Sequence, residues 1–106
     1  MNRPIGWGEV WWLELADIGR RPALVLTRPA ALERLPRILV APATTHRRGL
    51  VSEVALDADD GLPQPCVLSL DTPELVSKGL LVEYVATLSA MRMEEVCRAL
   101  GAAVNC

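Results

Sequence analysis

The stretch Pro22-Ala23-Leu24-Val25-Leu26-Thr27 decides the fold class, because it is a near-continuous apolar run with no polar face. Such a run predicts a β-strand that is covered on both sides. Outward from it, short runs of β-forming residues alternate with turn signals. Further strands are predicted over residues 9–15, 37–41, 53–56, 66–70 and 82–88. Pro29 opens one predicted helical turn over residues 29–34, and residues 72–80 are expected to be irregular.

One helix is predicted near the C-terminus, over residues 90–102. Ser89 is a suitable N-cap, and acids in the early turns match the helix dipole. Apolar residues recur at helical spacing, which marks the buried face: Met93, Val96, Cys97, Leu100, Ala103 and Val104. Several short strands followed by one helix indicate a mainly β fold with a C-terminal helix, arranged as a small, strongly curved barrel.

Size and composition bound the possibilities. A chain of 106 residues suffices for a single domain, residues 1–106, and for no second core. The mean hydropathy of +0.25 is high for a small chain and indicates surface reserved for a partner, such as a second copy. No run of 18 apolar residues occurs, so no membrane span is expected. No apolar stretch precedes Glu9, so we expect no secretory signal and a cytoplasmic location.

The three cysteines, Cys66, Cys97 and Cys106, are widely spaced and form no C-x-x-C motif. With a single histidine in the chain, they do not predict a metal site, and no cofactor is expected. All three are predicted to be free thiols, with Cys66 and Cys97 in the core. A catalytic thiol paired with His46 is an alternative, which the usual burial of cysteine disfavours.

A basic block stands out in this acidic protein, whose formal net charge is −2. Residues 20–48 hold seven arginines and a single acid, Glu33, for a formal charge of +6. Two clusters within the block are candidate site pieces: Arg20-Arg21-Pro22 and Thr44-Thr45-His46-Arg47-Arg48-Gly49. Any one of these arginines, taken alone, is best interpreted as a solvated surface residue. Together they predict a local patch that binds a phosphate chain or an acidic partner segment.

The three tryptophans lie close together near the N-terminus. An exposed tryptophan can stack on a base, but tryptophan in a strand is more often core or interface. We predict that Trp12 is core and that Trp11 is core or interface. Trp7 fits either interpretation.

Six short motifs follow one another between Gly8 and Leu100. They are Gly8-Glu9-Val10-Trp11, residues 20–26, residues 40–45, Arg48-Gly49-Leu50 with Glu53-Val54, Gly61-Leu62-Pro63, and Leu88-Ser89 with Met93-Glu94-Glu95-Val96. Each motif alone is weak. In this order and spacing they resemble the MazF/PemK family, the toxins of bacterial type II toxin–antitoxin pairs.

The resemblance implies an SH3-like barrel that forms a homodimer. It also implies metal-independent cleavage of single-stranded RNA at short recognition sequences, which would inhibit translation and growth. The expected partner is a cognate antitoxin whose disordered C-terminal segment occludes the RNA groove. Catalytic roles fall on Arg21, which directly precedes the proline of the second strand, and on Thr44, which follows the third strand.

These residues suit the chemistry. The 2′-hydroxyl attacks the neighbouring phosphorus, and a guanidinium such as that of Arg21 stabilises the charge that develops on the phosphate oxygens. Arg21 is also a candidate proton shuttle, although a guanidinium holds its proton tightly and is a poor base. Thr44 would hold the scissile phosphate. RNA-binding roles are predicted for Arg20, Thr45, His46, Arg47 and Arg48, and His46 is a second candidate for the base.

Two departures from the family pattern bear on specificity. The loop between the first two strands is short, only Ala16-Asp17-Ile18-Gly19. After the fifth strand, Asp71-Thr72-Pro73-Glu74-Leu75 lacks the arginine that relatives often carry there. The missing arginine leads us to expect either a different cut-site preference or weaker RNA binding. The short loop shortens the segment that lines and gates the site in relatives, so a carboxylate from it is not counted among the site residues.

Two other functions compete with RNA cleavage. CcdB-type toxins share the fold and bind DNA gyrase through a C-terminal Trp-Gly-Ile, whereas this chain ends Val104-Asn105-Cys106. The other alternative is an inactive relative that only binds an antitoxin or RNA. An RNA-cleavage assay separates both from the first interpretation.

Overall fold

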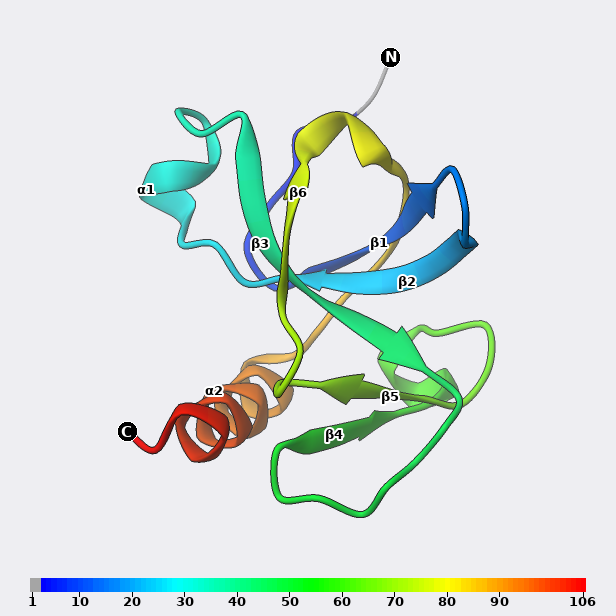
Figure 1. Ribbon diagram of the computed structural model, residues 1–106, viewed down its shortest axis with the longest axis vertical. Helices are drawn as coiled ribbons and strands as arrows, with labels where there is room; N and C mark the ends of the chain where they lie inside the picture. Colours follow the sequence, from blue (N-terminus) through cyan, green and yellow to red (C-terminus); the bar gives the residue numbers. More distant parts are fainter. Residues whose placement is uncertain (1–2) are drawn as a thin grey trace.

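A curved antiparallel sheet and a C-terminal helix make up the fold (Figure 1). The computed structural model describes residues 3–106. Met1 and Asn2, which begin the N-terminal segment in which no secretory signal is expected, lie outside the described residues. The strands are β1 (Glu9–Leu15), β2 (Gly19–Val25), β3 (Arg37–Thr44), β4 (Glu53–Leu56), β5 (Cys66–Ser69), β6 (Glu74–Ser77) and β7 (Leu81–Thr87). The helices are α1 (Pro29–Leu32) and α2 (Ala90–Val104), with 3-10 turns η1 (Ala58–Asp60) and η2 (Lys78–Leu80).

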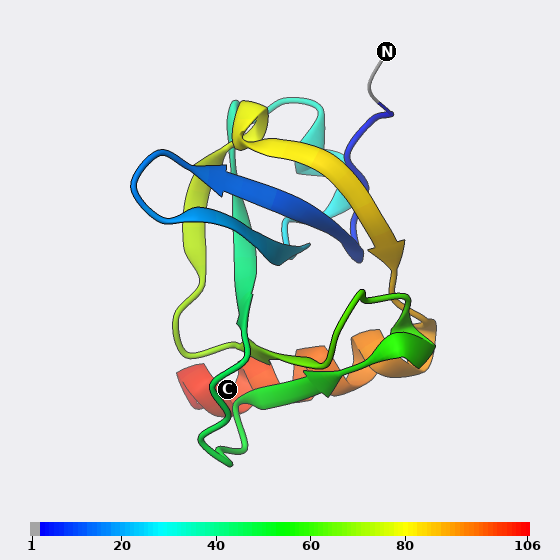
Figure 2. The same cartoon turned by 90° about the vertical axis from the view of Figure 1, so that its right-hand side faces the viewer.

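The sheet runs in the order β4-β5-β3-β2-β1-β7, and β6 pairs with β3. β3 links two halves of the molecule, because its first residues pair with β6 whereas Ala43 and Thr44 pair with β5. Figure 1 shows β3 running from α1 to the β4–β5 half, and Figure 2 shows α2 lying behind β4 and β5. The predicted class, mainly β with a C-terminal helix in a small SH3-like barrel, is confirmed.

Both faces of β2 are buried, as its apolar sequence predicts. Leu24 belongs to the core beneath α2, together with Val10, Leu68, Met93 and Val96. Its neighbours Ala23 and Val25 belong to a second core on the opposite face. Leu24 and Val25 have no exposed surface. Burial of each such aliphatic side chain stabilises the fold by roughly 1.5–3 kcal/mol, so β2 is anchored from two sides.

Helix α2 begins where the sequence predicts. The Ser89 hydroxyl accepts a hydrogen bond from the Arg92 backbone N–H at 3.1 Å, and Asn105 closes the helix in a left-handed conformation. The buried stripe is Met93, Val96 and Ala99. The prediction that Cys97 is core is wrong: its thiol is exposed and lies at the edge of this stripe. Within residues 3–106, no helix has the length and apolar character to span a bilayer.

The prediction that Trp12 is core is wrong, whereas Trp11 lies in the core, one of the two places predicted for it. Trp11 is 3% exposed in the second core, meets Tyr84 edge-to-face at 6.1 Å, and donates its indole N–H to Glu9 at 2.9 Å. Trp12 is only partly buried and lines a cavity instead of the core. Alternation does not separate the two residues, because both faces of β1 are covered. Trp7 is 42% exposed.

Predicted boundaries also change. The third strand, predicted over residues 37–41, runs on to Thr44 because Pro42 pairs with Ala23. Residues 72–80, expected to be irregular, contain β6 and η2. The short strand β6 owes its form to pairing with β3, between residues about 40 apart in sequence, which local patterns do not reveal. β2 starts at Gly19, before Pro22, because the hairpin pairs Leu15 with Gly19. Gly19 has φ +86°, a left-handed conformation that glycine adopts without strain.

Candidate functional site

Two neighbouring cavities open at the end of β3. The larger has a volume of about 370 Å³ and the smaller about 200 Å³, and both are lined by Arg21, Ala43 and Thr44. We call the two together the strand-end groove. Arg20 and Thr45 also line the larger cavity, and Arg48 lines the smaller one. The groove therefore carries arginines along its whole length.

The strand register explains why Arg21 and Thr44 share this groove. β2 and β3 pair antiparallel, with Leu24 opposite Ala41 and Ala23 opposite Pro42. The paired register ends at Ala23 and Pro42, and Arg21 and Thr44 each lie two residues beyond it, at the same end of the two strands. Because β2 is fixed by two cores, the backbone that carries Arg21 is rigid.

The Thr44 hydroxyl donates to no group within the part of the chain that the structure describes. Its hydroxyl oxygen accepts a hydrogen bond from the backbone N–H of His46 at 3.1 Å. A threonine hydroxyl can accept and donate at the same time, so its O–H remains able to donate to a phosphate oxygen. The backbone turn at residues 44–46 therefore fixes the hydroxyl without consuming its proton.

Arg20 is held by acids outside the groove. Its Nε donates to Glu14 at 3.0 Å, and a terminal guanidinium nitrogen lies 3.5 Å from Glu83. All three side chains are about half exposed. Exposed ion pairs contribute about 0–1 kcal/mol, so a phosphate can compete with these carboxylates for Arg20.

Glu53 fixes the basic loop of residues 45–50. Its carboxylate accepts hydrogen bonds from three successive backbone N–H groups, those of Arg48 at 3.1 Å, Gly49 at 2.8 Å and Leu50 at 3.2 Å. Gly49 has φ +74°, which lets the amides converge. Burial alone would raise the pKa of Glu53, but the amides of Leu50, Arg48 and Gly49 outweigh it and lower the pKa. This tether was not recognised from the sequence, although Glu53 belongs to a quoted motif.

The groove gathers five of the seven predicted site residues, which are Arg20, Arg21, Thr44, Thr45 and Arg48. His46 and Arg47 line neither cavity and are exposed on the adjoining loop. The arginines of the basic block between the two clusters do not all lie at the groove. Arg28 and Arg34 line a separate cavity beside α1, near the start of β3 rather than its end.

Cys66 also lines the larger cavity. Burial raises the pKa of its thiol, and the negative charge of Asp60 raises it further. The thiol is therefore protonated at neutral pH and is a weak nucleophile, which disfavours thiol catalysis. Within residues 3–106, no three His, Cys, Asp or Glu side chains gather closely enough to hold a metal ion.

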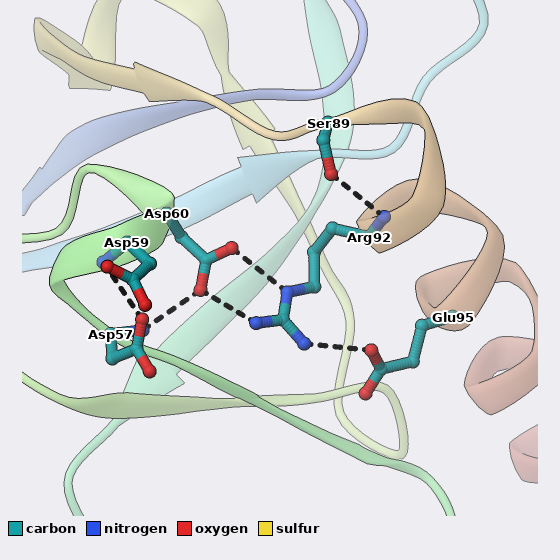
Figure 3. Close-up of polar contacts among 6 residues, drawn as sticks. All are labelled: Asp57, Asp59, Asp60, Ser89, Arg92 and Glu95. Carbon is teal, nitrogen blue, oxygen red and sulfur yellow. Dashed lines mark hydrogen bonds and ion pairs between the residues drawn. The ribbon is translucent and has the colours of Figure 1, made fainter.

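A charged clamp holds the loop that forms one wall of the groove (Figure 3). The Arg92 guanidinium of α2 donates to both oxygens of Asp60, at 2.9 and 3.0 Å, and to Glu95 at 2.8 Å. Burial alone would raise the pKa of Asp60, but the hydrogen bonds from Arg92 and from the Asp57 backbone lower it. Residues 61–65 follow directly. Gln64 from this loop lines the larger cavity and was not among the predicted site residues.

The model of the PemK-like and MazF-like toxins of type II toxin–antitoxin systems matches residues 7–104. The chain belongs to the PemK/MazF toxin family. A probable endoribonuclease MazF5 of Mycobacterium tuberculosis is 51% identical over 100 residues, which cover 93% of this chain and 92% of the relative. The resemblance drawn from the six motifs is thereby confirmed.

Solved structures agree with this PemK/MazF assignment. The Mycobacterium tuberculosis toxin MazF-mt6 superposes with a TM-score of 0.84 at 34% identity, covering 92% of this chain and 96% of that one. A MazE–MazF structure from Deinococcus radiodurans gives a TM-score of 0.80 at 28% identity, covering 97% of both chains. The family match favours the MazF-type interpretation over a gyrase-binding toxin.

Proposed function

We propose that this PemK/MazF toxin is an endoribonuclease that cleaves single-stranded RNA without a metal and at short recognition sequences. The observation that carries the proposal is the shared position of Arg21 and Thr44, which come from different strands and line the same two cavities. Relatives at 51% and 35% identity bear the name probable endoribonuclease, which supports the same chemistry here. Cleavage of cellular RNA would inhibit translation and growth.

In the proposed reaction, the 2′-hydroxyl oxygen attacks the adjacent phosphorus, and the bond to the 5′-oxygen breaks. The products are a 2′,3′-cyclic phosphate and a 5′-hydroxyl end. Charge builds on the non-bridging oxygens, where Arg21 provides a permanent positive charge and paired N–H donors. Removing one preorganised donor from such a site costs about 10²- to 10³-fold in rate.

Thr44 would hold the same phosphate through its free O–H. Arg20 in the larger cavity and Arg48 in the smaller one would bind the flanking phosphates, with Thr45 beside them. His46 and Arg47, outside the cavities, would contact RNA farther along the chain. Contacts of this kind fix the register of the backbone on the protein.

The proton transfers need a separate account, because a guanidinium holds its proton too tightly for Arg21 to act as a base. Among the residues that line the groove, none is Asp, Glu or His. We propose that Arg21 acts by charge. Water accepts the proton of the 2′-hydroxyl and returns one to the leaving 5′-oxygen.

Partners follow from the same site. We propose that a cognate antitoxin covers the groove with an acidic, disordered C-terminal segment, whose carboxylates would replace RNA phosphates on Arg20, Arg21 and Arg48. The homologous MazE–MazF structure supports a partner of this kind. We also propose a homodimer, supported by the family and the apolar composition, which acts in the cytoplasm.

The test incubates the purified protein with a long single-stranded RNA in EDTA and maps the fragment ends. We expect discrete cuts with 5′-hydroxyl ends, lost in Arg21→Ala and strongly reduced in Thr44→Val. Arg28→Ala, which removes an arginine beside α1, is the matched control and should cut normally. Absence of cutting by the folded protein, or equal cutting by Arg21→Ala, would overturn the proposal.

A further inference from the structure

The larger cavity reaches well beyond Arg21 and Thr44. Its other walls are formed by Trp12, Ile18, Pro22, Pro63 and Gln64. We propose that this part of the cavity is a nucleobase subsite in which Gln64 reads the base edge. The proposal rests on the RNA-cleaving function above and adds the residue that sets its sequence preference.

The walls suit a flat, neutral, largely apolar ligand. Ile18 is 60% exposed at the tip of the β1–β2 hairpin, and Trp12 is only partly buried. A base placed between them would cover both side chains, and aromatic stacking is tolerant of base identity. The apolar side chains therefore supply affinity for a base without choosing among the four.

The charge distribution separates this subsite from the phosphate site. Arg20 and Arg21 are the only charged residues that line the larger cavity, among the residues that the structure describes. A phosphate held by Arg21 and Thr44 leaves the base of the adjoining nucleotide next to Pro63 and Gln64. The volume of about 370 Å³ lies near the lower end of the usual range for small-ligand sites, which suits a single nucleotide.

Gln64 is presented by a stiff loop. It lies between Pro63 and Pro65, so its own backbone is restricted to extended conformations and its neighbours have fixed φ. The Asp60–Arg92 clamp holds the start of the same loop on α2. Little conformational entropy is lost when such a side chain binds a ligand.

The Gln64 amide is available for recognition. Within residues 3–106 it takes part in no hydrogen bond, although it is exposed at the cavity. A glutamine amide presents a donor and an acceptor side by side, which pairs with the edge of an unstacked base. A good bidentate pair of this kind discriminates between bases by about 5- to 150-fold.

The chemistry of the amide gives a sharp prediction. In Gln64→Glu the donor becomes a second acceptor, which pairs with two adjacent base donors, the N1–H and N2–H₂ of guanine. The base preference should therefore shift toward guanine at one position of the recognition sequence. Gln64→Met keeps the size and removes both polar atoms, so the preference at that position should be lost. Trp12→Leu should weaken RNA binding for all four bases equally.

The experiment has two arms. In the first, wild type, Gln64→Glu, Gln64→Met and the distant control Glu33→Gln cut a random-sequence single-stranded RNA pool, and the base frequencies around each cut are counted. In the second, each protein is titrated with four 2′-fluoro oligonucleotides, which lack the attacking hydroxyl and differ at one base. We expect a change of at least 5-fold in base preference at one position for both Gln64 variants, and none for Glu33→Gln.

The outcomes distinguish the two proposals. Cutting by all variants with unchanged base frequencies overturns the role of Gln64 and leaves the nuclease intact. Absence of cutting by the wild type overturns the nuclease. In that case the titrations still decide the subsite, because an unchanged order of affinities in both Gln64 variants refutes it and a changed order supports it.

Discussion

The Asp60–Arg92 clamp allows the effect of one substitution to be worked out from its geometry. Asp60→Ala removes three hydrogen bonds to the carboxylate, two from Arg92 at 2.9 and 3.0 Å and one from the Asp57 backbone N–H at 3.0 Å. The Asp60 and Arg92 side chains are 9% and 27% exposed. Breaking a fully buried pair costs about 3–5 kcal/mol. Arg92 keeps Glu95 and some contact with water, so we expect a loss of about 2–3 kcal/mol in the free energy of unfolding. For a chain of this size the melting temperature should fall by about 8–12 °C.

Urea unfolding followed by circular dichroism measures this loss directly. Asp59→Asn is the matched control, because Asp59 lies on the same 3-10 turn and its side chain is exposed. A double-mutant cycle with Arg92→Met should give a coupling of about 1–2 kcal/mol between the two side chains. A loss below about 0.5 kcal/mol in Asp60→Ala, or no coupling in the cycle, would refute the reasoning.

The clamp also predicts a pH dependence. The pKa of Asp60 is lower in the folded protein than its usual value, so its carboxylate stabilises the fold above the unfolded pKa of about 3.9. That contribution disappears as the pH falls through the folded pKa. The difference in unfolding free energy between wild type and Asp60→Asn should therefore narrow below about pH 4. A constant difference from pH 7 to pH 2 would contradict this assignment.

Four further outcomes are expected. Glu53→Ala frees the loop of residues 45–50 and should raise the KM for RNA with little change in kcat. Glu53→Gln keeps one acceptor oxygen and should behave closer to wild type. Steady-state cleavage of a fluorogenic oligonucleotide measures KM and kcat for the two variants. Gly61→Ala should lower the free energy of unfolding by about 2–4 kcal/mol in urea titrations, because φ is +90° and the new Cβ would lie 2.8 Å from the Cβ of Ala86. His46→Ala should cut RNA within about twofold of the wild-type rate, since its side chain lines neither cavity, and a loss of about 100-fold would identify it as the base. RNA affinity measured by fluorescence anisotropy should fall about 50-fold between 50 and 200 mM salt if four phosphates are bound, and a flat response would exclude the arginine contacts.

Much of this fold can be predicted from residues that are close together in the sequence. The apolar run of β2 and the Ser89 cap of α2 each depend on neighbouring residues, and both predictions are confirmed. β6 could not be predicted in this way, because its form depends on pairing with β3. Cys97 was misplaced since it lies one position beyond Val96, at the edge of the buried stripe, where periodicity does not separate buried from exposed.

Some residues of the candidate site could be predicted from the sequence, and others could not. Arg21 and Thr44 were nominated from motifs, and their common groove follows from a strand register that the sequence does not reveal. Gln64 escaped notice because a lone glutamine between prolines carries no motif. The Glu53 tether likewise depends on how three amides converge in space. The catalytic roles of Arg21 and Thr44 stay predictions until the variants are assayed.

The tether at Glu53 has an evolutionary consequence. The loop of residues 45–50 takes its shape from backbone amides bound to a single carboxylate, and the side chains at 45–47 donate no hydrogen bond to that carboxylate. Those positions can therefore change identity while the loop path is retained. A lineage could diversify which RNA sequences it contacts by substituting residues 45–47 one at a time, without passing through a misfolded intermediate.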